Sequence, residues 1–85
     1  MANIVIWSKP GCFYCDQAKE ILESMELEYV EKCVGNGYTV EQFREAAPHA
    51  KSYPQIFIYG NHIGGFSDLV DYIEQTGYNG SGYTL

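Results

Sequence analysis

Two cysteines separated by two residues stand where an apolar run gives way to an amphipathic pattern. The run Ile4-Val5-Ile6-Trp7 is near-continuous and rich in β-branched residues, as expected of a strand buried on both faces. Pro10-Gly11 breaks that strand, and the residues that follow have the spacing of one helix face. This strand–turn–helix pattern places Cys12 at the start of a helix and Cys15 one helical turn further on.

The position of Cys12 at a helix start favours its thiolate form. The first backbone N–H groups of a helix lack partners and carry the positive end of the helix dipole, and Lys9 adds a nearby positive charge. In such settings the pKa of a cysteine falls from about 8.5 to about 3.5–7.5. Because Cys15 can reach the same sulfur, we expect an attacking thiol beside a resolving thiol, which is the equipment for thiol–disulfide exchange.

Length, charge and cysteine count narrow the class of protein. A chain of 85 residues has room for one small domain, and a net charge of −6 argues against nucleic-acid binding through a basic surface. No apolar run has transmembrane length, and the first residues lack the pattern of a signal peptide, so we expect none. The odd number of three cysteines argues against a secreted disulfide framework. We therefore expect a cytoplasmic monomer that binds neither membranes nor nucleic acids.

The remaining segments predict an α/β domain. Strands are expected at Asn3–Trp7, Leu27–Val34 and Gln55–Tyr59, the last paired through a tight turn at Gly60-Asn61 with His62-Ile63. A first helix carries its apolar face on Tyr14, Ala18, Ile21, Leu22 and Met25. A second begins at the N-cap Thr39, with a capping box to Gln42, and ends before Pro48. A third begins at the N-cap Ser67, with Leu69, Val70 and Ile73 facing inward.

The order of these elements is βαβ-α-ββα, which predicts a four-stranded mixed sheet flanked by three helices. The first β-α-β unit should be parallel with a right-handed crossover, and the later hairpin should add antiparallel strands. Residues 1–76 form the expected domain. Residues 77–85, rich in Gly, Tyr, Asn and Ser, are expected to be a flexible C-terminal tail.

With these residues in place, the chain resembles a dithiol glutaredoxin of the thioredoxin fold over about residues 3–76. Three motifs carry the resemblance: Lys9 through Cys15, Ser52-Tyr53-Pro54 before the third strand, and Gly64 through Asp68 before the last helix. The resemblance implies a glutathione-dependent thiol–disulfide oxidoreductase with Cys12 as nucleophile and Cys15 as resolving thiol. Its implied substrates are glutathionylated or disulfide-containing proteins, with ribonucleotide reductase among them.

The resemblance also implies a glutathione site. Pro54 would be a cis-proline that presents the backbone of Tyr53 to the cysteine of glutathione as an added strand. The N–H groups of Ser67 and Asp68 would bind the γ-glutamyl carboxylate, and the Asp68 carboxylate would pair with the ligand's amine. Lys9 would meet the glycine carboxylate, and Tyr14 would line the groove. The full implied binding set is Lys9, Tyr14, Tyr53, Pro54, Gly65, Phe66, Ser67 and Asp68, with no metal ligand.

Two positions depart from the usual glutaredoxin pattern. Phe13 stands where the family usually has proline and restores a backbone N–H that proline lacks. Tyr53 is bulkier than the valine common at its position. Cys33 fits either a small buried strand residue or a secondary redox site, while His49 and His62 are interpreted as surface residues.

Two other functions remain open at this stage. One is a dimer that holds a [2Fe–2S] cluster through two Cys12 thiolates and two glutathiones, which would give visible absorbance after anaerobic purification. The other is a zinc-binding interaction module, which would contain stoichiometric metal and unfold on chelation.

Overall fold

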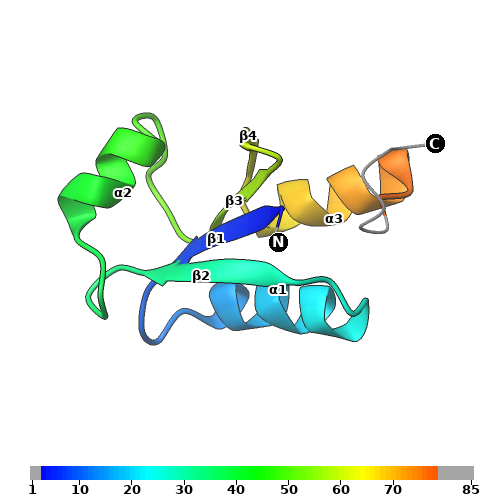
Figure 1. Cartoon of the computed structure of the whole chain (residues 1–85), viewed down its shortest axis with the longest axis horizontal. Helices are drawn as coiled ribbons and strands as arrows, with labels where there is room; N and C mark the ends of the chain where they lie inside the picture. Colours follow the sequence, from blue (N-terminus) through cyan, green and yellow to red (C-terminus); the bar gives the residue numbers. More distant parts are fainter. Residues whose placement is uncertain (1–2, 79–85) are drawn as a thin grey trace.

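The computed structural model describes residues 3–78 of the chain. Its elements are β1 (Ile4–Ser8), α1 (Phe13–Ser24), β2 (Tyr29–Cys33), α2 (Val40–Ala46), β3 (Gln55–Ile58), β4 (Asn61–Gly64) and α3 (Phe66–Thr76) (Figure 1). This order confirms the predicted βαβ-α-ββα arrangement. None of the helices in residues 3–78 has the length and apolar character needed to cross a membrane.

The four strands form one mixed sheet in the order β2-β1-β3-β4. β1 pairs in parallel with β2, from Ile4 opposite Tyr29 to Ser8 opposite Cys33. β1 also pairs antiparallel with β3, and β3 pairs antiparallel with β4. The central position of β1 explains its near-continuous apolar sequence, because a central strand is covered on both faces.

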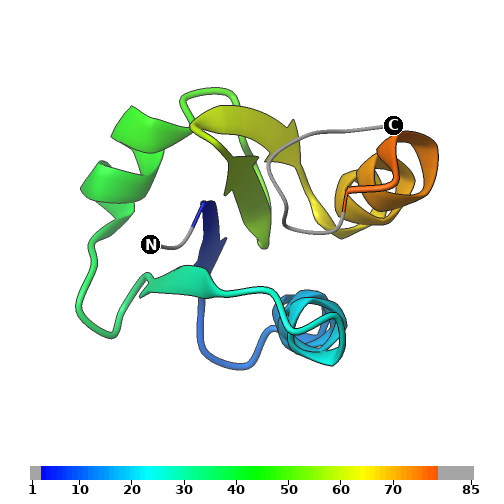
Figure 2. The same ribbon diagram turned by 45° about the vertical axis from the view of Figure 1, so that its right-hand side comes forward.

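The side chains of β1 alternate between two cores. Ile4 and Ile6 pack with Ile56 and Ile58 of β3 on the face that α1 and α3 cover, together with Ala18, Leu22 and Leu69. Trp7 points to the other face and packs with Val34, Phe43 and Ala47 beneath α2. Figure 2 shows α2 on one side of the strands and the other two helices on the opposite side. The prediction that the run from Ile4 to Trp7 is a strand buried on both faces is confirmed.

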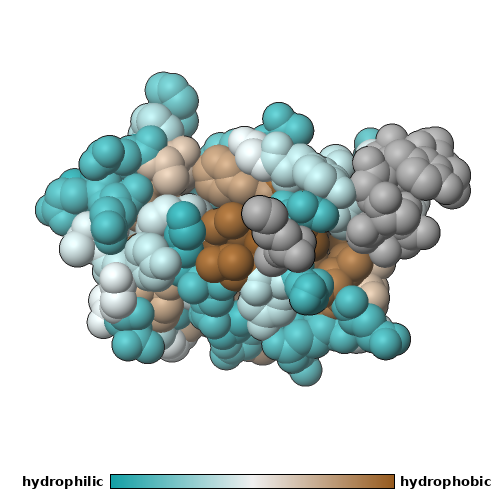
Figure 3. All heavy atoms as spheres, viewed as in Figure 1, coloured by the Kyte–Doolittle hydropathy of each residue, from teal (hydrophilic) through white to brown (hydrophobic). Residues whose placement is uncertain are grey.

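The α2 side of the sheet is the less completely covered of the two. Brown, apolar atoms are visible near the middle of Figure 3, over the strands labelled β1 and β3 in Figure 1, with tan atoms above them and teal and white atoms beside them. Val5 and Phe57 pack against the core on this side but are only partly buried. A seven-residue helix is too short to cover the whole face.

The third helix begins earlier than predicted. Its N-cap is Gly65, not Ser67, because the Asp68 carboxylate accepts the backbone N–H of Gly65 at 3.0 Å and closes the first turn from within the helix. Leu69 and Ile73 face inward as predicted. Tyr72, rather than Val70, completes the inward face.

Two other sequence expectations need correction. The hairpin turn comes one residue early, since Tyr59 and Gly60 have positive φ and β4 already begins at Asn61. Tyr14, expected on the inner face of the first helix, is 56% exposed. It lies in the first turn of α1, beyond the edge of the core.

Tyr78 shows that ordered packing continues past residue 76. Its side chain is 3% exposed, joins the α1–α3 core and lies 5.9 Å from the Tyr72 ring. Gly77, at φ 68°, ends α3 in the left-handed conformation that glycine adopts readily and turns the chain back toward the core. The rest of the predicted tail, residues 79–85, lies outside the described residues.

Candidate active site

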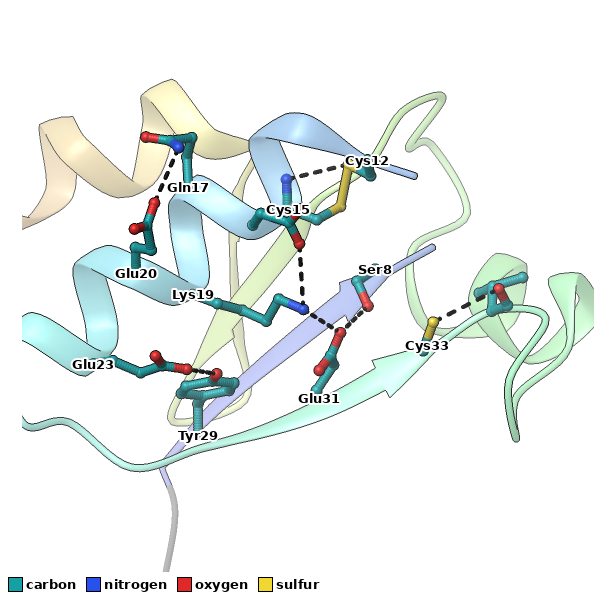
Figure 4. A network of polar contacts seen from close by, with 12 residues as sticks. Ser8, Cys12, Cys15, Gln17, Lys19, Glu20, Glu23, Tyr29, Glu31 and Cys33 are labelled. Atoms are coloured by element: carbon teal, nitrogen blue, oxygen red, sulfur yellow. Dashed lines mark hydrogen bonds and ion pairs between the residues drawn. A yellow bond between two sulfur atoms is a disulfide. The ribbon is translucent and has the colours of Figure 1, made fainter. Parts of the chain in front are cut away.

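Cys12 and Cys15 form a disulfide, with their Cα atoms 5.2 Å apart. Cys12 is the N-cap of α1, and its Sγ accepts the backbone N–H of Cys15 at 3.2 Å (Figure 4). The expected placement of Cys12 at a helix start, with its partner sulfur within bonding range, is therefore confirmed. A thiolate at Cys12 would have this N–H and the positive end of the helix dipole beside it.

The two sulfurs differ in their access to solvent. Cys12 is 9% exposed and Cys15 is 1% exposed, so only Cys12 presents an edge to an incoming disulfide. Cys15 lies inside the first helical turn, where it can attack the Cys12 sulfur but not a substrate. Cys33, the remaining described cysteine, is free and partly buried at the end of β2.

A small polar network joins the three elements that hold the cysteine pair. Ser8 at the end of β1 donates to Glu31 Oε2 of β2 at 2.6 Å, and Lys19 Nζ of α1 lies 2.9 Å from the same oxygen (Figure 4). The Ser8 hydrogen bond, followed by Lys19, lowers the pKa of the Glu31 carboxyl. The Glu31 hydrogen bond in turn raises the pKa of Lys19. The network fixes α1 relative to β1 and β2, and hence the position of the disulfide.

A groove of about 880 Å³ begins at Tyr14, the residue before Cys15, although neither Cys12 nor Cys15 is among its lining residues. Tyr14, which stands between the two cysteines in sequence, lines it from α1 and contacts Phe66 of α3 with ring centroids 5.4 Å apart. Its other walls come from the connector before β3 and the start of α3. The lining residues are Tyr14, His49, Ala50, Lys51, Ser52, Tyr53, Pro54, Gln55, His62, Gly64, Gly65, Phe66, Ser67 and Asp68.

The second and third motifs meet in this groove. The Tyr53-Pro54 peptide bond is cis, as the resemblance implied. A Cβ on Gly65 would lie 3.6 Å from the Pro54 carbonyl oxygen, so the start of α3 lies directly against the proline segment. This contact brings the backbone of Tyr53 and the first turn of α3 to one wall of the groove.

The first turn of α3 presents unpaired N–H groups to this wall. Ser67 and Asp68 are both exposed and lie at the second and third positions of the helix. These N–H groups have no partner within the helix and favour an anion. Asp68 keeps one carboxylate oxygen on the Gly65 N–H and has the other left for a ligand.

Lys9 lies close to the groove but is not among its lining residues. Its Nζ is 5.5 Å from the centre of the Tyr53 ring, and Phe43 stacks on that ring at 4.5 Å. The ring therefore has a fixed place between α2 and the Lys9 side chain. The role of Lys9 in binding a carboxylate stays a prediction.

Sequence reasoning missed several groove residues. Lys51 and Gln55 were not singled out, yet both line the groove. His49 and His62 are exposed, as interpreted, and they line the groove as well. For Lys51 and Gln55 the available signal was their position in the sequence, directly before and after the Ser52-Tyr53-Pro54 motif. For His62 the available signal was the predicted hairpin, because the hairpin pairs β4 with β3. Across residues 3–78, no three His, Cys, Asp or Glu side chains come together in a way that could hold a metal ion.

Comparisons with known proteins agree with this geometry. A glutaredoxin family model matches residues 4–63, which include the cysteine pair and the cis-proline. The chain is 40% identical over 70 residues to hybrid peroxiredoxin hyPrx5 of Haemophilus influenzae, covering 82% of this chain and 29% of that protein. It is 39% identical over 70 residues to glutaredoxin 3 of Escherichia coli, covering 81% and 83% respectively.

The structural comparison points the same way. Glutaredoxin from Brucella melitensis superposes with a TM-score of 0.76 at 29% identity, over 100% of this chain and 96% of that one. This likeness confirms the predicted thioredoxin fold. The chain spans less than a third of the hybrid peroxiredoxin, so that similarity concerns the matched part alone.

Proposed function

This chain belongs to the glutaredoxin family and is a thiol–disulfide oxidoreductase, and on that premise we propose that it takes its electrons from glutathione. The observation that carries the proposal is the shared wall of the groove, where the Tyr53 backbone and the first turn of α3 meet, with Tyr14 of the Cys12–Cys15 segment against Phe66 of that turn. A backbone edge that can pair like a strand, next to a site for an anion, suits a short anionic peptide whose sulfur must face Cys12.

The proposed reaction begins with the Cys12 thiolate. It attacks the glutathione sulfur of a glutathionylated protein, the S–S bond breaks, and the protein cysteine leaves as a thiolate that takes up a proton. Cys12 is then joined to glutathione in a mixed disulfide. A second glutathione thiolate attacks the bound glutathione sulfur, which releases glutathione disulfide and restores the Cys12 thiolate.

Protein disulfides require the second cysteine. Cys12 forms a mixed disulfide with one protein sulfur, and the Cys15 thiolate then attacks Cys12 and releases the second protein thiol. This leaves the Cys12–Cys15 disulfide of the structure. Two glutathione molecules reduce it in turn, so two electrons pass from glutathione to the substrate.

The groove supplies groups for each part of glutathione. The γ-glutamyl carboxylate would bind the N–H groups of Ser67 and Asp68, and its amine would bind the free Asp68 oxygen. The peptide of the ligand's cysteine would pair with the Tyr53 backbone. Lys9 would bind the glycine carboxylate from the Tyr53 side, while Tyr14, Pro54, Gly65 and Phe66 would form the walls.

The setting of the reaction is also part of the proposal. A cytoplasmic location is proposed because glutathione keeps thiols reduced there. The protein would act as a monomer on disulfide-containing and glutathionylated proteins, with ribonucleotide reductase as one electron acceptor.

The proposed function is tested with the mixed disulfide of glutathione and 2-mercaptoethanol as substrate, in the presence of glutathione. We expect Cys12→Ser to abolish the reaction, Cys15→Ser to retain it, and Cys33→Ser, the matched control, to behave as the unchanged protein. Cys15→Ser should lose the reduction of a protein disulfide. Absence of glutathione-dependent turnover in the reduced, unchanged protein would refute the proposal.

A further inference from the structure

Gln55 is a buried polar residue that connects the groove loop to the β3–β4 hairpin. It is 7% exposed, immediately follows Pro54, and begins β3. Its Nε2 donates to the Ser52 carbonyl at 3.1 Å, and its Oε1 lies 2.7 Å from His62 Nε2. Burying an amide that has no hydrogen-bond partner costs free energy. Here both the nitrogen and the oxygen of the Gln55 amide have a partner.

The two contacts determine which group donates and which accepts in each hydrogen bond of Gln55. Since the Gln55 nitrogen donates to a carbonyl, its oxygen faces His62 and can only accept. His62 Nε2 therefore carries the hydrogen and donates. The His62 ring is itself held in place, because it stacks on Phe57 with centroids 4.6 Å apart and an interplanar angle of 12°. The hairpin thus anchors the Gln55 amide.

The Ser52 carbonyl belongs to the same peptide unit as the Tyr53 N–H. Among residues 3–78 the cis peptide bond is Tyr53-Pro54, so the Ser52–Tyr53 peptide is trans. In a planar trans peptide the C=O and the N–H point in opposite directions. When Gln55 holds the Ser52 oxygen on the buried side, the Tyr53 N–H must point the other way.

No other side chain of the described residues makes a hydrogen bond to the segment from His49 to Pro54. That segment has no strand or helix structure of its own, so its peptide planes depend on few contacts. Although stacking on Phe43 holds the Tyr53 ring, without the clamp the Ser52–Tyr53 peptide plane loses its side-chain hydrogen bond, and its N–H is less well aligned with a ligand.

We propose that Gln55 and His62 are positioning residues that direct the Tyr53 N–H toward the bound substrate. This inference rests on the proposed function, because it assumes that a substrate peptide pairs with the Tyr53 backbone. The clamp is expected to act on binding, since the hydrogen bonds of Gln55 and His62 join these residues to Ser52 and to each other, not to the cysteines. Its loss should raise the KM for the glutathione mixed disulfide and leave kcat nearly unchanged.

The test compares four single variants and one double variant with the unchanged protein. Gln55→Met removes both contacts at similar length, while Gln55→Glu keeps the acceptor for His62 and loses the donor to Ser52. His62→Phe keeps the stacked ring and loses the N–H. Gln17→Met is the matched control, because it removes an exposed glutamine whose Nε2 donates to Glu20 on α1. Thermal unfolding confirms that each variant is folded.

Both Gln55 variants are expected to raise KM about fivefold, the worth of one hydrogen bond, with kcat and the rate of Cys12 alkylation unchanged. His62→Phe should raise KM less, and combining it with Gln55→Met should add nothing further. Gln17→Met should match the unchanged protein. Unchanged KM in Gln55→Glu, or additive effects in the double variant, would overturn the inference.

A second readout does not depend on glutathione. The ¹⁵N order parameters of the Ser52 and Tyr53 amides should fall in Gln55→Met and stay unchanged in Gln17→Met. If the unchanged protein has no glutathione activity, the proposed function fails while this readout still reports on the clamp. If activity is present but the order parameters do not change, the clamp fails alone.

Discussion

Replacing Glu31 with Gln tests the network that holds α1 against the sheet. Gln keeps an oxygen that can accept from Ser8 but loses the charge that faces Lys19 at 2.9 Å. A charged hydrogen bond contributes about 1.5–3 kcal/mol when shielded from water. Because the Glu31 side chain is 32% exposed, solvent screening reduces the expected loss to about 1 kcal/mol. For a domain of this size, the expected fall in Tm is about 5 °C.

The pH dependence of this loss follows from the pKa of Glu31. The Ser8 hydrogen bond and Lys19 lower that pKa in the folded state, so the carboxylate stabilises the fold fully above its ordinary pKa of about 4.3. The contribution is lost as the pH falls through the lowered folded value, where a protonated Glu31 resembles Gln. Lys19, whose pKa is raised by the Glu31 hydrogen bond, stays charged over this range.

The assay is thermal or urea unfolding of the oxidised protein from pH 7 down to pH 2. Glu28→Gln serves as the control, since Glu28 is exposed and lies outside the network. The gap between the unchanged protein and Glu31→Gln should be constant near neutrality and close at acid pH. A gap that persists at pH 2, or one no larger than that of Glu28→Gln, would refute the reasoning.

Three further changes have definite expected outcomes. Asp68→Asn keeps an oxygen for the Gly65 N–H and loses the charge offered to the ligand's amine, so steady-state kinetics should show a KM for glutathione raised about fivefold. Phe13→Pro places proline at the first position of α1 and removes a side chain that is 67% exposed, so calorimetry should show stabilisation by about 0.4–1 kcal/mol. Tyr78→Ala empties a core position and should destabilise the fold by about 3 kcal/mol in urea titrations, whereas a loss below about 0.5 kcal/mol would show that Tyr78 is not a core residue.

The elements that sequence alone could locate are those with strong periodic or terminal signals. The apolar run of β1, the Thr39–Gln42 capping box and the cysteine pair all have local causes, and each appears where expected. The start of α3 was misplaced because Gly65 lacks a side chain, and its cap comes from Asp68 three residues later. This cap is also a local contact, but the sequence offers Gly65 and Ser67 as alternative starts and does not decide between them.

The groove shows the limit of sequence reasoning most clearly. The cysteine, proline and glycine motifs could be read one by one, but their meeting at one wall depends on the sheet order and on the contact between Gly65 and Pro54. Gln55 and His62 lie on different strands, and only the hairpin register brings their side chains together. Tyr78 was assigned to a tail because its neighbours are polar and small, a local pattern that says nothing about the core it reaches.

The central claim is that the start of α1 keeps the Cys12 sulfur ionised near neutral pH. The direct measurement is the rate of iodoacetamide alkylation of Cys12 as a function of pH, in a Cys15→Ser, Cys33→Ser protein. With the Cys15 backbone N–H and the helix dipole beside the sulfur, the midpoint should lie below about pH 7.5. A midpoint at or above the ordinary thiol value of about 8.5 would contradict the account.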